Sequence, residues 1–154
     1  MTKFLLAVHV LAVILTIGPV TVAASMFPAT ARRVAADPAH DAAVLGVLHR
    51  ICRVYALIGI VVPVFGIATA SSLGVLGDLW LIVSIVLTAA AAALLALLVL
   101  PRQRQILAAL PGLEVPVAHW RAPARLAMVT GMFNLLWAAV TVLMIVRPGS
   151  TTGA

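Results

Sequence analysis

Four long apolar segments, separated by polar connections, dominate the hydropathy pattern of the chain. They cover residues 4–31, 54–73, 79–100 and 126–146. A helix of about 20 residues crosses the roughly 30 Å hydrocarbon core of a bilayer, and each segment reaches about that length. The pattern predicts an all-α protein: a bundle of four transmembrane helices that forms one domain over residues 1–148. A disordered tail is expected over 149–154.

The first segment also has features of a cleaved signal peptide. Lys3 precedes the apolar run, and Val22-Ala23-Ala24 comes before Ser25. Cleavage there would leave Arg32 and Arg33 on the outer side, against the tendency of basic residues to stay in the cytoplasm. We therefore expect the segment to be retained as a transmembrane helix.

Composition supports insertion into a membrane. Hydrophobic residues make up 64% of the chain and charged residues 9%, with a mean hydropathy of +1.23. So few charges cannot cover the surface of a soluble domain. The net charge of +6 comes from basic residues at the ends of the apolar segments. There they favour a lipid bilayer rather than nucleic acid as the partner.

The arginines of the two long connections predict the orientation. Eight of them lie in or beside these connections: Arg32, Arg33, Arg50, Arg53, Arg102, Arg104, Arg121 and Arg125. By the positive-inside rule, both connections face the cytoplasm and both termini lie outside. The arginines are then expected at the membrane interface, among anionic lipid headgroups.

Both connections also contain helical patterns. Residues after Asp41 show apolar positions at helical spacing that run into the second segment. The stretch from Arg102 to Leu110, between two prolines, is predicted to be a short amphipathic helix at the membrane interface.

Small and polar residues within the segments predict helix contacts. Such positions recur at spacings of three or four on one face of a helix and let backbones approach closely in lipid. They are Gly59, Pro63, Gly66 and Ala70 in the second segment, Ser84, Thr88 and Ala92 in the third, and Thr130, Asn134, Ala138 and Thr141 in the fourth. We expect Asn134 to hydrogen-bond within the bundle. Pro19 and Pro63 predict kinks.

His9 is the strongly polar residue of the first segment. Counting depth along alternating helices places it in one layer with Thr69, Ser84 and Thr141. In this layer the imidazole either hydrogen-bonds to a hydroxyl or binds a cofactor, haem or copper being the candidates. For haem, Met144 is the candidate second axial ligand.

A weaker candidate metal site lies near the cytoplasmic start of the second segment. His49 and Cys52 are three residues apart and share a helix face, and His119 in the other long connection is a possible third ligand. These residue types bind zinc or copper. The alternative is an interfacial histidine beside a small buried thiol.

Catalytic and coupling groups are sparse in the sequence. We find no glycine-rich phosphate loop, no nucleophile beside a base and no acidic residue within an apolar segment. The leading hypothesis is a non-enzymatic accessory or scaffold protein, paired with another membrane protein or a second copy of itself. The alternatives are a haem- or copper-binding redox protein that uses His9, and a small-molecule permease that uses the kinked helices.

Several short motifs resemble a bacterial family of predicted integral membrane proteins of unknown function. They are His9-Val10 with Gly18 nine residues later, Trp80-Leu81, Pro101 with basic residues after it, and Leu143-Met144 followed by Arg147-Pro148. That family is similar in layout to inner-membrane copper-resistance proteins and to the membrane protoporphyrinogen oxidase type, in which a helix 1 histidine serves haem or metal. The resemblance implies a multi-pass protein of the bacterial inner membrane and maps only His9 onto that role. Thr16 stands where those relatives often carry Trp.

Overall fold

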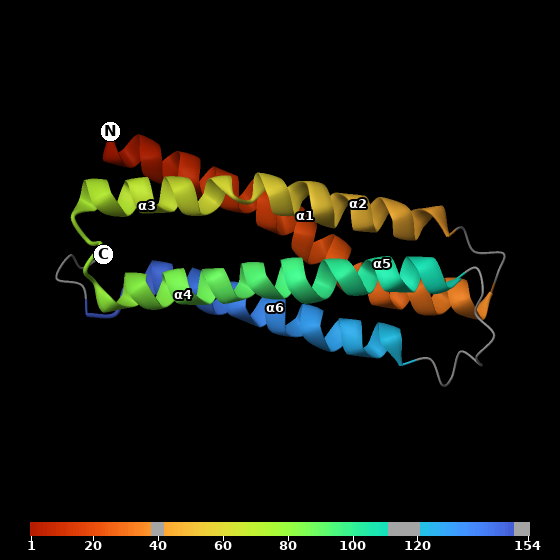
Figure 1. The fold of residues 1–154 in the computed structure, drawn as a ribbon. Helices are drawn as coiled ribbons and strands as arrows, with labels where there is room; N and C mark the ends of the chain where they lie inside the picture. The colour runs from red at the N-terminus through yellow and green to blue at the C-terminus, as the bar shows by residue number, and fades with distance from the viewer. Residues whose placement is uncertain (38–41, 111–120, 150–154) are drawn as a thin grey trace.

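The computed structural model describes residues 1–37, 42–110 and 121–149, and these residues form a bundle of four long helical spans (Figure 1). The first span is α1 (Thr2–Ala36), and the second consists of α2 (Ala43–Ile58) and α3 (Val61–Leu73). The third consists of α4 (Leu79–Ala93), a π-helical turn η1 (Leu94–Val99) and α5 (Leu100–Ala109), and the fourth is α6 (Ala122–Val146). All four spans are long and apolar enough to cross a membrane, as the sequence predicts.

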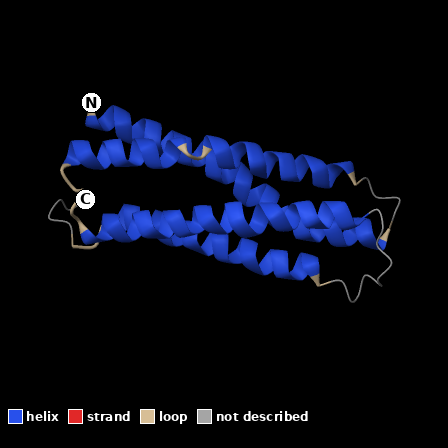
Figure 2. Cartoon of the chain, viewed as in Figure 1, coloured by secondary structure: helices blue, strands red, loops and turns tan. Residues whose placement is uncertain are grey.

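Pro19 and Pro63, where the sequence predicts kinks, lie in different local structures. α1 continues through Pro19 without a break. The second span is interrupted between Ile58 and Val61, where Figure 2 shows a short loop. Pro63 has no N–H to donate to the carbonyl of Gly59, and this carbonyl instead accepts from Val62 at 3.1 Å. This bond spans three residues and not the four of an α-helix, and it separates α2 from α3.

The third span differs most from its predicted bounds. The stretch from Arg102 was expected as a separate helix along the interface, but α5 continues the direction of α4 into the bundle (Figure 1). Two of its side chains, Gln103 and Ile106, are buried. The π-helical turn η1 ends at Val99, two residues before Pro101, where an α-helical hydrogen bond to Leu97 is impossible. The expected helix before the second segment is confirmed from Ala43 onward.

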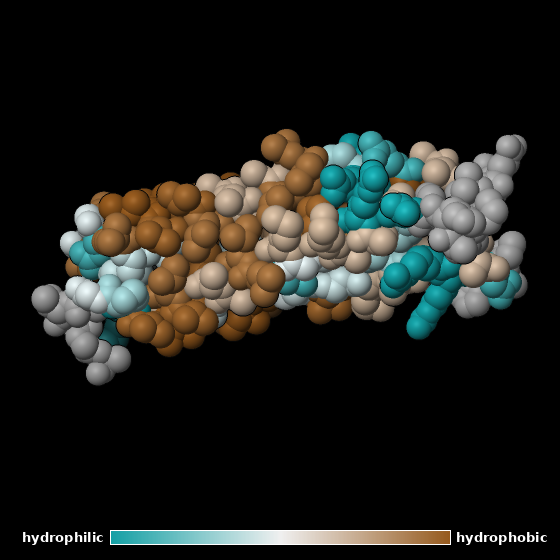
Figure 3. Space-filling view, turned by 90° about the horizontal axis from the view of Figure 1, so that it is seen from below, coloured by the Kyte–Doolittle hydropathy of each residue, from teal (hydrophilic) through white to brown (hydrophobic). Residues whose placement is uncertain are grey.

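The two ends of the bundle differ in composition. The start of α1 and the end of α6, together called the end with the termini, lie near the turn between α3 and α4 (Figure 1). This turn begins at Gly74, whose φ of +72° is the left-handed conformation that glycine adopts readily. The arginines of the long connections lie toward the opposite end, where Figure 3 shows a hydrophilic surface next to a broad apolar one. The tail beyond Gly149 lies outside the described residues.

Packing is dense toward the arginine end. Its cluster of buried side chains comes from α1, α2, the third span and α6, and includes Phe27, Leu45, Cys52, Ala91, Val99, Ile106, Leu126 and Phe133. At the end with the termini, the buried cluster is small: Ala70, Trp80 and Leu81. Asn134 bridges helices as predicted, because its amide donates to the Ser25 hydroxyl at 3.0 Å and links α6 to α1.

The helix pairing explains this difference. α3 packs on α1, and α4 packs on α6, so the turn at residues 74–78 joins two helices that belong to different pairs. α3 and α4 therefore diverge, and the half of the bundle near the termini is left partly hollow.

Candidate functional site

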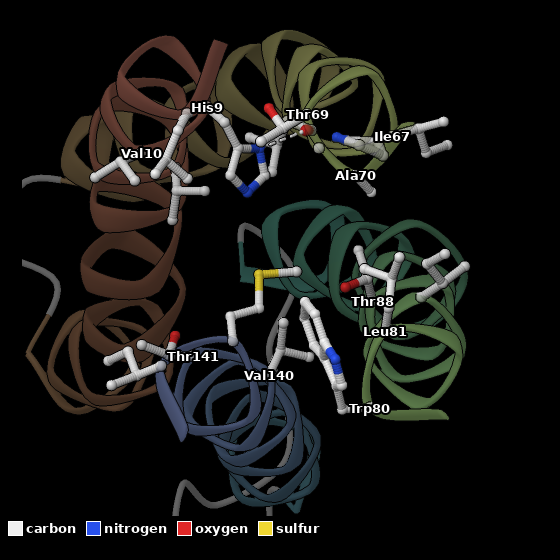
Figure 4. A pocket seen from close by; sticks show the side chains of 18 of the residues that line it. His9, Val10, Ile67, Thr69, Ala70, Trp80, Leu81, Thr88, Val140 and Thr141 are labelled. Carbon is white, nitrogen blue, oxygen red and sulfur yellow. Dashed lines mark hydrogen bonds between the residues drawn. The ribbon is translucent and has the colours of Figure 1, made fainter. Parts of the chain in front are cut away.

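A cavity of about 650 Å³ lies between α1, α3, α4 and α6 at the end with the termini (Figure 4). Its walls are mainly aliphatic, with side chains such as Val13, Ile67, Leu81 and Val140. Sites for small molecules and cofactors typically have volumes of about 300–1,000 Å³ and few polar groups. The cavity has the size and character of such a site.

His9 is the one imidazole in the described wall of this cavity. Its side chain is only 8% exposed, and Nδ1 lies 3.0 Å from the carbonyl oxygen of Val62. Because a carbonyl can only accept, Nδ1 carries the hydrogen and donates it. In the neutral ring, Nε2 then keeps its lone pair. Nε2 points into the cavity and has no hydrogen-bond partner among the described residues (Figure 4).

The sequence of α1 accounts for the direction of the His9 side chain. The buried positions that follow it, Thr16, Val20 and Ala23, lie on the same helix face at spacings of seven, four and three residues. This face packs into the bundle along the whole of α1. His9 is therefore directed inward by the same pattern that buries the core.

Gly66 of α3 makes room for the imidazole. A Cβ at this position would lie 3.0 Å from His9 Cε1 and 3.3 Å from Nδ1. Real Cβ atoms rarely approach so closely, so a side chain here would require the imidazole to shift by a few tenths of an ångström. Gly66, which the sequence marked as a helix-contact residue, brings α3 directly against the histidine.

The other members of the predicted polar layer have different roles. Thr69 and Thr141 line the cavity with His9, but their hydroxyls donate to the carbonyls of Phe65 and Trp137 in their own helices. Ser84 is fully buried, donates to the Trp80 carbonyl and is not part of the cavity wall. The structure thus brings three of the four residues to one cavity and pairs the histidine with a backbone carbonyl.

Two further residues of the wall have atoms suited to ligand contacts. Thr88 of α4 presents its hydroxyl to the cavity, and this hydroxyl has no partner among the described residues (Figure 4). Met144, the predicted second axial ligand, lies in the same cavity on α6. A thioether is a weak acceptor and an established haem ligand.

Charged and aromatic groups meet at the rim near the termini. Trp80 lines the cavity and donates its Nε1–H to Asp78 Oδ2 at 2.9 Å. The Arg147 guanidinium lies over the Trp80 ring, with Cζ 5.6 Å from the ring centroid. Arg147 is not among the site residues predicted from the sequence, although its position directly after the fourth apolar segment places it at this end of the bundle.

The second candidate site, around His49 and Cys52, contains a residue that the sequence analysis missed. Gln103 of α5 is fully buried, and its Oε1 lies 2.9 Å from His49 Nδ1. Its Nε2 donates to Cys52 Sγ at 3.5 Å. Within the described ranges, no three His, Cys, Asp or Glu residues group around a metal position, and His119 lies outside those ranges. The described contacts form a polar link between α2 and α5.

Comparisons of this chain with models of protein families, with curated proteins and with solved structures give no match. The family resemblance of the motifs therefore remains a prediction. The fold supports a four-helix protein with four long apolar spans.

Proposed function

We propose that this chain is a multi-pass protein of the bacterial inner membrane that holds a haem-type cofactor in the cavity, with His9 as its protein ligand. The observation that carries the proposal is the His9 imidazole, whose Nδ1–H is fixed by Val62 and whose Nε2 points into an apolar cavity. Metal-binding histidines usually donate their other ring N–H to a carbonyl or carboxylate, which sets the tautomer. His9 has this arrangement.

The cavity fits a flat apolar cofactor better than a bare copper ion. In haem, the porphyrin supplies four nitrogen ligands to the iron, so the protein has to supply only one or two further ligands. Copper would need its whole ligand set from side chains. The described wall supplies one imidazole and one thioether, from His9 and Met144, within about 650 Å³ of mainly apolar space. Bound haem would supply one-electron redox chemistry or binding of a small axial ligand.

The protein's own part in such a site is positioning and exclusion of water. The hydrogen bond to Val62 and the close approach of Gly66 fix the orientation of the imidazole ring. The cavity is partly open, since lining residues such as Ile14 and Ile145 are exposed, but its aliphatic walls offer few polar contacts. Such walls favour neutral, apolar ligands and raise the cost of binding a hydrated solute. This character favours cofactor binding over transport of a polar solute by a permease.

An accessory role in the membrane agrees with the cavity. With a bound cofactor, the protein could serve as the redox-active partner of another membrane protein, so the accessory role and haem binding do not exclude each other.

For the orientation, we propose that both termini lie outside, with the eight arginines in contact with anionic headgroups on the cytoplasmic side.

A titration with ferric haem tests the proposal. Purified protein in mild detergent is expected to shift the Soret band and to saturate at one haem per chain. His9→Ala should weaken binding at least roughly tenfold and change the spectrum, because the axial nitrogen is lost. His49→Ala is the matched control, since His49 lies toward the other end of the bundle, and it should bind as the wild type does. Equal spectra and affinities for the wild type and His9→Ala would refute the role of His9.

A further inference from the structure

We infer that Arg147 forms a subsite for carboxylate groups at the rim of the cavity, so that the ligand is an amphiphile with an apolar body and an acidic end. This inference rests on the proposed function and names a chemical property of the ligand. For haem, the acidic groups are its two propionates.

The conformation of Arg147 directs its side chain back over the bundle. The residue follows α6 in the left-handed region, with φ of +45°, and its N–H caps the helix by donating to the Leu143 carbonyl. Its Nε donates to the Met144 carbonyl at 3.3 Å. Two contacts with the end of α6 thus hold the stem of the side chain beside the cavity.

The guanidinium is oriented by Trp80. This indole is only 7% exposed, and its hydrogen bond to Asp78 fixes the ring. A cation over an indole face is attracted by the electron density of the ring, most strongly where water is partly excluded. The ring therefore holds the guanidinium at the rim before any ligand is bound.

The terminal nitrogens of Arg147 remain available for a ligand. Within the described residues, neither terminal nitrogen has a hydrogen-bond or salt-bridge partner. A guanidinium binds a carboxylate through two parallel N–H···O bonds, and a position beside apolar walls strengthens the attraction. The Asp78 carboxylate is bonded to Trp80 and does not line the cavity.

The depths of His9 and Arg147 in the bundle predict how the ligand is oriented. His9 lies seven residues inside the start of α1, about 10 Å along the helix axis. Arg147 directly follows α6 at the end of the bundle where α1 begins. A ligand that reaches both would place its apolar body deep between the helices and its acid at the interface.

Haem and its dimethyl ester, in which both propionates are masked, test the inference. Wild-type protein should bind the diacid more tightly than the ester. Arg147→Gln should weaken binding of the diacid roughly tenfold, leave the ester affinity unchanged and keep the wild-type Soret position. Arg147→Lys should retain part of the preference. Lys3→Gln is the control, because this exposed cation at the same end does not line the cavity.

The outcomes separate the two proposals. Arg147→Gln protein that binds diacid and ester with the same relative affinity as the wild type would overturn the carboxylate subsite and leave the role of His9 intact. Wild-type protein that gives no His9-dependent Soret shift with either compound would overturn the proposed function and the inference with it. Retained ester binding by Arg147→Gln shows that the variant is folded.

Discussion

The position of His9 depends on the absence of a side chain at Gly66. Because a Cβ would lie 3.0 Å from the imidazole, Gly66→Ala should displace the ring and lengthen the hydrogen bond to Val62. We expect at least a roughly tenfold loss of haem affinity, of the size that follows the loss of a supporting contact to a metal ligand. Absorption titration measures it.

Gly46→Ala provides the matched control for this prediction. Gly46 is also helical, and a Cβ there would meet no atom within 4 Å. Its replacement should leave haem affinity unchanged and stabilise the helix by about 0.5–1 kcal/mol. The same loss of affinity in both variants would mean that Gly66 has no special relation to His9.

Single residues were predicted from sequence to different degrees. Depth along a helix follows residue number, which is why the sequence placed His9, Thr69, Ser84 and Thr141 in one layer; the first two and Thr141 line the cavity, and Ser84 does not. Their hydrogen-bond partners were not predicted, because threonine hydroxyls reach carbonyls of their own helix and backbone carbonyls accept second bonds. Gln103 was missed because its burial depends on how the third span extends beyond Pro101.

At the scale of the helices, α4 faces two different environments. Ala91 is fully buried in the dense cluster, and its neighbour Ala92 lines the cavity. Ala91→Leu should lower the free energy of unfolding by about 1–3 kcal/mol, because the cluster has no space for three more carbons. Thermal unfolding in detergent checks this value.

Ala92→Leu should change ligand affinity and not stability. The added atoms can enter the cavity, so stability should stay close to that of the wild type while haem affinity falls, because the ligand loses volume. The two variants share a helix and a substitution, which equalises helix propensity. Similar stability losses in both would indicate that the cavity closes in solution.

The number of helical spans follows from the sequence, and their exact extent does not. Apolar length predicted four spans, and Pro63 predicted a kink in the second one, which is interrupted between Ile58 and Val61. The pattern did not predict that α5 continues α4, since an amphipathic stretch with arginines fits both an interfacial helix and a bundle helix. Because Gln103 and Ile106 are buried, this stretch is a helix of the bundle and not an interfacial helix.

On the scale of the whole molecule, the helical spans are longer than the hydrocarbon core of a membrane is thick. α1 has 35 residues, about 52 Å as a helix, against a hydrocarbon core of about 30 Å. The extra helix length and the position of the arginines favour one arrangement in the membrane. In it, the densely packed end of the bundle extends past the headgroups, while the end with the cavity stays within the bilayer. The cavity would then be surrounded by lipid.

The predicted orientation can be tested with single cysteines in a Cys52→Ser background. Gly77, in the turn between α3 and α4, and Ala108, near the end of α5, are both exposed. In intact cells, a membrane-impermeant maleimide should label Gly77→Cys, and it should label Ala108→Cys only after permeabilisation. The reverse pattern would place the arginines outside.

The absorption spectrum of protein purified from haem-replete cells in mild detergent is the sharpest test of haem binding at His9. We expect a Soret band that corresponds to one haem per chain in the wild type and in His49→Ala, and its loss in His9→Ala. A colourless wild type, or a band that persists unchanged in His9→Ala, would contradict it.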